Sequence, residues 1–255
     1  MIKGTVSTFG ALVLFIGAWL IFASGTKRGK RFSIRRVAGI QAVDEAVERC
    51  TEMGRPVHFA TGTGALDSSM IASFAIMSYI ATKCAQMDTG LIVSAGLPEI
   101  YQISEGVVRQ AYVEAGKMGS FRAENVRYLT SAVAAYEIAV DGLLHRENPG
   151  ANLMFGPFNA EAMMIAERGN RLGLVQIAGT NSFLSLARFV ATCDYVLIGD
   201  ELYSAAAYLF RDKEPDRVNQ VLAQDVLKLG AFLVILIGTI LTSSGNGIVA
   251  KLLAK

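Results

Sequence analysis

The residues with the clearest chemical potential form short turns of small and polar side chains after apolar runs of strand length. Thr61-Gly62-Thr63-Gly64 follows one run, and Gly156-Pro157-Phe158-Asn159 follows another. Backbone N–H groups in such turns, at the start of a helix, can hold an anion. The pattern therefore indicates a site for a nucleotide-like or phosphate-bearing ligand. Its candidate residues are Gly62, Thr63, Gly64, Gly96, Gly156, Asn159, Gly179, Thr180, Asn181 and Asp200.

Ordinary turn chemistry explains the same residues. Sharp connections between strands and helices favour Gly, Asn, Asp, Ser and Thr as turn and N-cap residues. The segment HFATGTG departs from GxGxxG because Asp67 stands where the third glycine would be, and the chain has no GxxxxGK[ST] motif. Both interpretations stay open, and the cofactor, if there is one, is unknown.

Side chains suited to catalysis are few. His58 lies inside an apolar run and is expected to be an interior histidine, while His145 lies near a helix end, where a cation complements the helix dipole. No GxSxG, HExxH or CxxC motif is present, and the three cysteines are too scattered for a disulfide framework or a zinc site. We therefore assign no catalytic residue and no metal ligand, and the balance leans against an enzyme.

Apolar runs alternate with amphipathic segments between residues 33 and 228. The predicted strands cover 57–60, 91–95, 126–130, 152–155, 174–178 and 195–198. The predicted helices cover 40–53, 67–87, 99–117, 131–146, 159–170, 183–191 and 200–211. In the first helix, Ile40, Val43, Val47 and Cys50 share one face. The alternation predicts an α/β fold with a mostly parallel, Rossmann-like sheet flanked by helices. The glycine-bearing turns would then gather at the carboxyl edge of the sheet, where ligands usually bind.

An apolar segment lies toward each end of the chain. Residues 4–26 and 229–250 contain no Asp, Glu, Lys, Arg or His. Each is long enough to cross a bilayer, which takes about 20 mostly apolar residues. We expect a transmembrane helix in both, over 5–24 and 229–249. The alternatives are a cleavable signal peptide for the first segment and an interfacial or re-entrant helix for the second, whose far end is polar.

Basic residues after the first segment predict its orientation. This membrane-surface collar consists of Lys27, Arg28, Lys30, Arg31, Arg35 and Arg36. Because basic flanks stay on the cytoplasmic side, the central domain is expected to be cytoplasmic. Nine of the 24 basic residues lie in the collar or near the termini, which leaves 15 against 22 acidic residues and a central charge near −7. This charge disfavours nucleic acid, while the collar suits anionic lipid.

Small residues recur at helical spacing in both apolar segments. These candidate helix-packing positions are Gly10, Gly17 and Ser24 in the first segment and Ala231, Gly238, Thr242 and Gly245 in the second. Small residues at such spacing let helices approach closely in lipid. The contacts could join the two helices of one subunit or the helices of different subunits.

Several segments of the central part carry a family resemblance. They are GRPVHFATGTG, VVRQAYVEAGK, ANLMFGPFNAEAMMIAERG, LVQIAGTNS and CDYVLIGDELYSAAAYL. Over about residues 35–245, the chain resembles an uncharacterised prokaryotic family of membrane proteins described only as a domain of unknown function. The resemblance implies an α/β domain tied to membrane helices and transfers no activity.

The expected organisation has four parts: a transmembrane helix (1–26), a basic collar (27–36), a cytoplasmic α/β domain (37–228), and a second transmembrane helix with its tail (229–255). We expect a scaffold in the inner (plasma) membrane that forms a ring-like homo-oligomer. Its partners would be the lipid bilayer, copies of itself and related membrane subunits. The alternative is a membrane-tethered enzyme or ligand-binding domain that uses the glycine-rich edge.

Overall fold

The computed structural model describes residues 38–209 and, beyond them, residues 13, 16, 17, 20, 225, 226, 228–232 and 236. The chain divides into two units, one of Arg35–Leu209 and one of Met1–Ile34 with Phe210–Lys255. Among the helices of the described residues, none has the length and apolar character needed to cross a membrane. The basic collar and most of both apolar segments lie outside the described residues, as do all the helix-packing positions except Gly17 and Ala231.

The Arg35–Leu209 unit is an α/β domain, as the alternating pattern predicted. Its strands are β1 (Val57–Ala60), β2 (Leu91–Ala95), β3 (Val126–Tyr128), β4 (Ala151–Phe155), β5 (Val175–Thr180) and β6 (Tyr195–Ile198). Its α-helices are α2 (Ala38–Met53), α3 (Ser68–Gln86), α4 (Pro98–Glu114), α5 (Val133–Glu147), α6 (Glu161–Arg171), α7 (Phe183–Thr192) and α8 (Asp200–Leu209).

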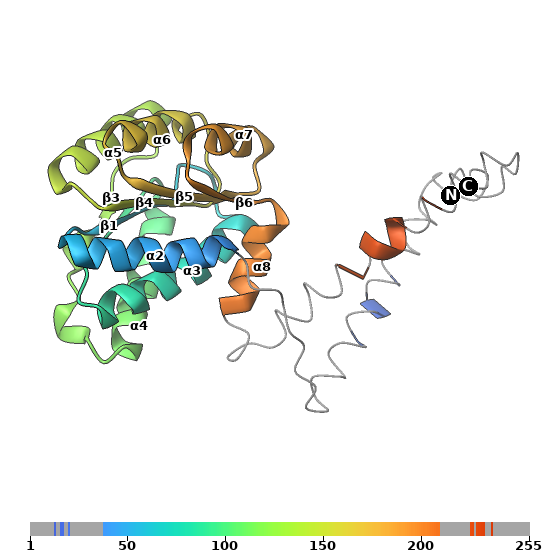
Figure 1. Cartoon of the computed structure of the whole chain (residues 1–255), viewed down its shortest axis with the longest axis horizontal. Coiled ribbons are helices and arrows are strands. Elements are labelled where there is room, and N and C mark those ends of the chain that lie inside the picture. Colours follow the sequence, from blue (N-terminus) through green and yellow to red (C-terminus); the bar gives the residue numbers. More distant parts are fainter. Residues whose placement is uncertain are drawn as a thin grey trace, which may run out of the picture. The chain divides into compact units, whose positions relative to one another are not determined.

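All six strands run parallel in the order β3-β2-β1-β4-β5-β6. Helices α5, α6 and α7 cover one face of the sheet, and α2, α3, α4 and α8 cover the other (Figure 1). Strands β1, β2 and β4 are buried along their whole length because both faces are covered. The order reverses between β1 and β4, so this pair forms the switch point of the sheet, where such folds bind ligands.

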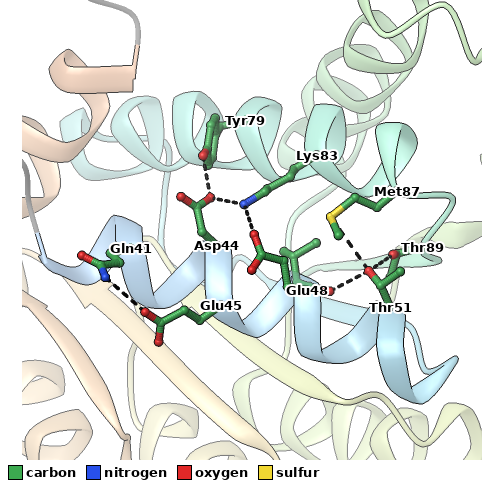
Figure 2. Close-up of polar contacts among 10 residues, drawn as sticks. Gln41, Asp44, Glu45, Glu48, Thr51, Tyr79, Lys83, Met87 and Thr89 are labelled. Atoms are coloured by element: carbon green, nitrogen blue, oxygen red, sulfur yellow. Dashed lines mark hydrogen bonds and ion pairs between the residues drawn. The ribbon is translucent and has the colours of Figure 1, made fainter.

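The leading helix α2 packs its predicted apolar face against the sheet. Ile40, Val43, Val47 and Cys50 are all buried. On its other flank α2 meets α3 through polar groups (Figure 2), where Asp44 accepts a hydrogen bond from the Tyr79 hydroxyl (2.5 Å) and pairs with Lys83 Nζ (2.7 Å). Because these groups are only partly buried, we expect them to orient α2 more than to stabilise it.

A row of buried polar side chains crosses the middle of the sheet. Register places His58, Asn152 and Gln176 side by side on β1, β4 and β5. His58 Nδ1 donates to Asn152 Oδ1 (2.8 Å), Asn152 Nδ2 donates to Gln176 Oε1 (3.2 Å), and His58 Nε2 accepts from the Ser94 hydroxyl (2.9 Å). Tyr136 of α5 completes the row through its hydroxyl, which donates to the Ser94 carbonyl (3.1 Å).

Each side chain of this row has a hydrogen-bond partner, so none is buried unsatisfied. The row therefore fixes the strands relative to one another without a desolvation penalty for an unpaired group. His58 is fully buried, as predicted for an interior histidine. Its burial lowers its pKa to about 4 from 6.5, with Arg127 adding to the shift and the Asn152 hydrogen bond opposing it. The imidazole is therefore neutral at pH 7.

The low pKa of His58 predicts a loss of stability in mild acid. Below pH 6.5 the His58 imidazole becomes protonated in the unfolded chain, whereas in the folded domain it stays neutral down to about pH 4. The free energy of unfolding should fall by about 2 kcal/mol between pH 7 and pH 5, at about 1.4 kcal/mol per pH unit below pH 6.5. Unfolding of the full chain in mild detergent, followed at pH 7, 6 and 5, measures this change.

His58→Gln should be less stable at pH 7 but should lose the pH dependence above pH 5. The matched control is His145→Gln, which removes the other, exposed histidine of the chain and should retain that dependence. Equal pH dependence in wild type and His58→Gln would contradict this assignment.

Candidate functional site

The turns after β1 and β4 meet at the switch point, as the predicted ligand site requires. Gly64 N donates to the Pro157 carbonyl (2.9 Å), which ties the two turns together. Gly62 has a positive φ of 76°, and a Cβ there would lie 2.9 Å from the Pro157 carbonyl oxygen. Gly96, after β2, packs against the Gly62–Thr63 backbone. The glycines thus let backbone segments of this protein approach one another.

A buried carboxylate occupies the centre of this junction. Glu161 is the first residue of α6 and is fully buried. Its Oε1 accepts from Thr63 N (2.9 Å) and from the Thr63 hydroxyl (2.7 Å), and its Oε2 accepts from Asn159 N (3.1 Å). Asn159 Nδ2 also donates to Thr63 Oγ1 (3.0 Å). A backbone N–H of the β1 turn, of the kind that holds phosphate in nucleotide-binding turns, is therefore bound to the protein's own anion.

A second carboxylate caps the helix that follows β1. Asp67 is the N-cap of α3, and its Oδ1 accepts from Met70 N (2.9 Å) and from the Ser69 hydroxyl (2.7 Å). This is the residue that replaces the third glycine of GxGxxG. Two carboxylates thus accept from Thr63 N and Met70 N, which lie where such folds hold a phosphate, and their charge disfavours an anionic ligand at the switch point.

A polar rim lies outside this junction. Asn181 Nδ2 contacts Asp67 Oδ2 (3.4 Å) and the Tyr203 hydroxyl (3.3 Å), and that hydroxyl also bonds Ser68 Oγ (2.9 Å). These side chains come from the β1 and β5 turns and from α8. They can offer hydrogen bonds to a neutral polar molecule, but none of them is a nucleophile activated by a base.

The other predicted site residues have separate roles. Gly179 packs closely against the Phe155 ring and Leu202. Thr180 is buried, and its hydroxyl accepts from Ser182 N (3.2 Å). Gly156 has a positive φ of 133° and lies against the Thr61 carbonyl. Asp200 begins α8 after the edge strand β6. The structure therefore brings together Gly62, Thr63, Gly64, Gly96, Gly156 and Asn159, with Asn181 on the rim.

The turn after β4 also holds α7. The Phe158 carbonyl accepts from the Ser185 hydroxyl (2.7 Å), and the Phe158 ring packs edge-on against Phe189 with centroids 5.2 Å apart. Arg188 Nη1 donates to the Asn159 carbonyl (2.8 Å). The segment that closes the switch point thus also sets the position of α7.

A separate groove of about 190 Å³ lies between α5 and α6, away from this edge. Its charged side chains include two ion pairs, Arg168 with Asp141 and Arg171 with Glu167. Across residues 38–209 and the few described positions beyond them, no group of three His, Cys, Asp or Glu side chains is placed to hold a metal ion. Burial raises the pKa of the Cys50 thiol to about 11 and that of Cys193 to about 12, which keeps both protonated and poorly nucleophilic at pH 7.

Sequence reasoning did not assign Glu161 to the site. Its partner Thr63 lies 98 positions away, and the connection depends on β4 lying next to β1. The available signal was local: Glu161 follows the Gly156–Asn159 turn by two residues, as a capping residue would.

Comparison with known proteins identifies the family. A family model described as a domain of unknown function (DUF6754) matches residues 2–253, and the chain belongs to this family. Neither the curated proteins nor the solved structures include a match. The family assignment confirms the resemblance to a domain of unknown function and assigns no activity.

Replacing Glu161 by Ala should destabilise the domain because it leaves buried N–H groups of two turns without an acceptor. We expect a loss of about 3 kcal/mol, seen as a lower thermal midpoint of the full chain. Glu167→Ala is the control on the same helix; its partly exposed ion pair with Arg171 should be worth less than about 0.5 kcal/mol.

Acetate should recover part of the stability of Glu161→Ala and leave the wild type unchanged, because the vacated N–H groups can bind a free carboxylate. If Glu161→Ala melts like Glu167→Ala, the buried carboxylate is not the junction that we describe.

Proposed function

We propose that this protein is a membrane-anchored assembly protein whose α/β domains pack side by side in a closed homo-oligomer, with no catalysis of its own. The observation that carries the proposal is the occupied switch point. Glu161 and Asp67 accept from Thr63 N and Met70 N at the place where such folds bind a nucleotide, and the Pro157 carbonyl accepts from Gly64 N of the β1 turn. The parallel α/β fold hosts many unrelated functions, and in this proposal its role is to form contacts between subunits.

The apolar segments at both ends support the membrane part of the proposal. Two anchors would hold all copies in one plane and one orientation, with the domains on the cytoplasmic side of the plasma membrane. Confinement of this kind multiplies weak lateral contacts through a high effective concentration. The small-residue stripes that contain Gly17 and Gly238 would add helix–helix contacts in lipid. Related membrane subunits, if present, would pack against the same stripes.

The domain charge must be compatible with this packing. Residues 38–209 hold 18 acidic and 11 basic side chains, a net charge of −7. Cellular salt screens such charge over about 8 Å. Copies can therefore approach where their facing surfaces carry few acidic groups.

A second candidate is a membrane-tethered domain that binds a small neutral ligand, or an enzyme acting on one. The polar rim of Asp67, Ser68, Asn181 and Tyr203 favours it, because these side chains come from the start of α3, from the β5 turn and from α8 and are joined by hydrogen bonds. Its ligand would be uncharged or cationic, since Asp67 in the rim and Glu161 in the junction behind it repel anions.

The particle mass of the full chain in mild detergent separates the two candidates. We expect a uniform particle of several 27.3 kDa subunits, measured by light scattering with detergent subtraction and by native mass spectrometry. Gly17→Leu should lower this mass by crowding the packing stripe, whereas Ala18→Leu, one residue off the stripe, should leave it unchanged. A 27 kDa monomer that retains a small molecule would favour the ligand-binding candidate instead.

A further inference from the structure

Helix α7 is apolar on both of its faces. Its inner face packs Ser185 and Phe189 onto the turn after β4. Its outer face, which we call the α7 face, consists of Phe183, Leu184, Ala187, Val190 and Ala191, all exposed. The exposed fractions of Phe183, Leu184 and Val190 are 82%, 69% and 58%. A surface helix normally carries charged residues on its outer side, and a helix that is apolar all round is normally buried.

The α7 face continues toward the exposed edge of the sheet. Register places Thr180 of β5 beside Ile198 of β6, and α7 begins three residues after Thr180. Ile198 is 53% exposed. Ile198 is thus a further exposed apolar side chain, on the edge strand next to the strand that leads into α7, and exposed apolar surface of this kind marks interaction sites.

We infer that the α7 face is a contact between two copies of this chain, in which α7 packs against α7 of a second copy. The inference rests on the proposed function and names one of the surfaces that the assembly would use: a two-fold contact joins copies in pairs, and a larger closed particle needs a second contact.

Charge favours a second copy as the occupant. The domain carries a net charge of −7, but α7 contains no acidic residue, so copies can meet there with little repulsion. A lipid surface fits less well because the one cation of α7, Arg188, donates to the Asn159 carbonyl within the same domain. Anionic lipid would need free basic side chains beside the apolar face.

The shape of the face suits a helix of the same kind. Ala187 and Ala191, four residues apart, form a shallow centre, and Phe183, Leu184 and Val190 form larger ridges around it. Two helices pack when the ridges of one fill the grooves of the other, and small residues at the crossing allow close approach. A two-fold contact centred on Ala187 places the two Ala187 side chains at the crossing, and the ridges of each copy pack on either side of it.

Disulfide cross-linking of the full chain in its membrane tests this contact. Ala187→Cys should form a dimer on mild oxidation, because the two-fold places both thiols at the crossing. Ala135→Cys, at an exposed alanine of α5, should remain largely monomeric at the same concentration. The native thiols contribute little background because Cys50 and Cys84 are buried and Cys193 has a raised pKa.

Charge substitution provides the second measurement. Phe183→Glu should raise the concentration at which the particle dissociates in mild detergent by at least tenfold. Ile138→Glu, which replaces a side chain of α5 that is 71% exposed, should leave it unchanged. Both substitutions lie on the surface, and circular dichroism should show the same fold for each.

The outcomes separate this inference from the proposed function. The α7 contact is overturned if Phe183→Glu and Ile138→Glu dissociate at the same concentration as the wild-type particle and Ala187→Cys cross-links no more than Ala135→Cys. The proposed assembly is unaffected by that outcome. A monomeric wild-type chain overturns both. A fluorophore on Ala187→Cys that is quenched by nitroxide lipids in phosphatidylglycerol vesicles shows that the face meets lipid, which also overturns the contact.

Discussion

The buried carboxylate of Glu161 joins the two halves of the sheet. Strands β1 and β4 are neighbours in space, but the chain between them forms β2, β3, three α-helices and two short 3-10 helices. The Glu161 side chain binds the turn after β1 through Thr63 and the turn after β4 through Asn159. Because the second turn also carries α7 through Phe158 and Asn159, one buried anion sets both the closure of the ligand edge and the position of an exposed helix.

This arrangement changes what the fold can do. In an open parallel sheet, the switch point is the place where free N–H groups and a crevice receive a ligand. Here the protein supplies the anion itself, and the glycines serve close backbone contacts instead of contacts with a phosphate. Glycine-rich turns after strands are therefore weak evidence for nucleotide binding unless the acceptor for their N–H groups is also known.

The sequence predicted the elements well because their signals are local. Strands 57–60, 91–95 and 195–198 are found as predicted, and the helix ends differ by at most a few residues. β5 continues through Gly179 and Thr180, which the sequence suggested as a turn, because the β4 and β6 ladders extend over these residues. β3 stops at Tyr128 instead of Thr130 because it is an edge strand with one neighbour. Strand order could not be predicted, because no residue pattern in the segment between β3 and β4 indicates that β4 pairs with β1 instead of β3.

The candidate site was predicted only in part, for the same reason. The turns that line the edge were identified, and their gathering at the carboxyl ends of parallel strands followed from the fold class. Glu161 and the Asn181–Asp67–Tyr203 rim depend on which strands are neighbours, so they required the topology. The α7 face was also missed, because the residue types show that the segment is apolar all round but do not show which of its sides stays exposed.

Polar and apolar groups are placed in this domain against the usual preference. His58, Asn152 and Gln176 are polar and lie in the centre of the sheet, while Phe183 and Leu184 are apolar and lie in solvent. A fully bonded polar row tolerates few alternative registers, because a shift of one residue would leave each group buried without a partner. An exposed apolar helix lowers the solubility of a free domain, so its retention is easiest to explain if it is covered in the assembled protein. The interior thus specifies one sheet register, while the outer face of α7 is apolar and exposed in the domain that the structure describes.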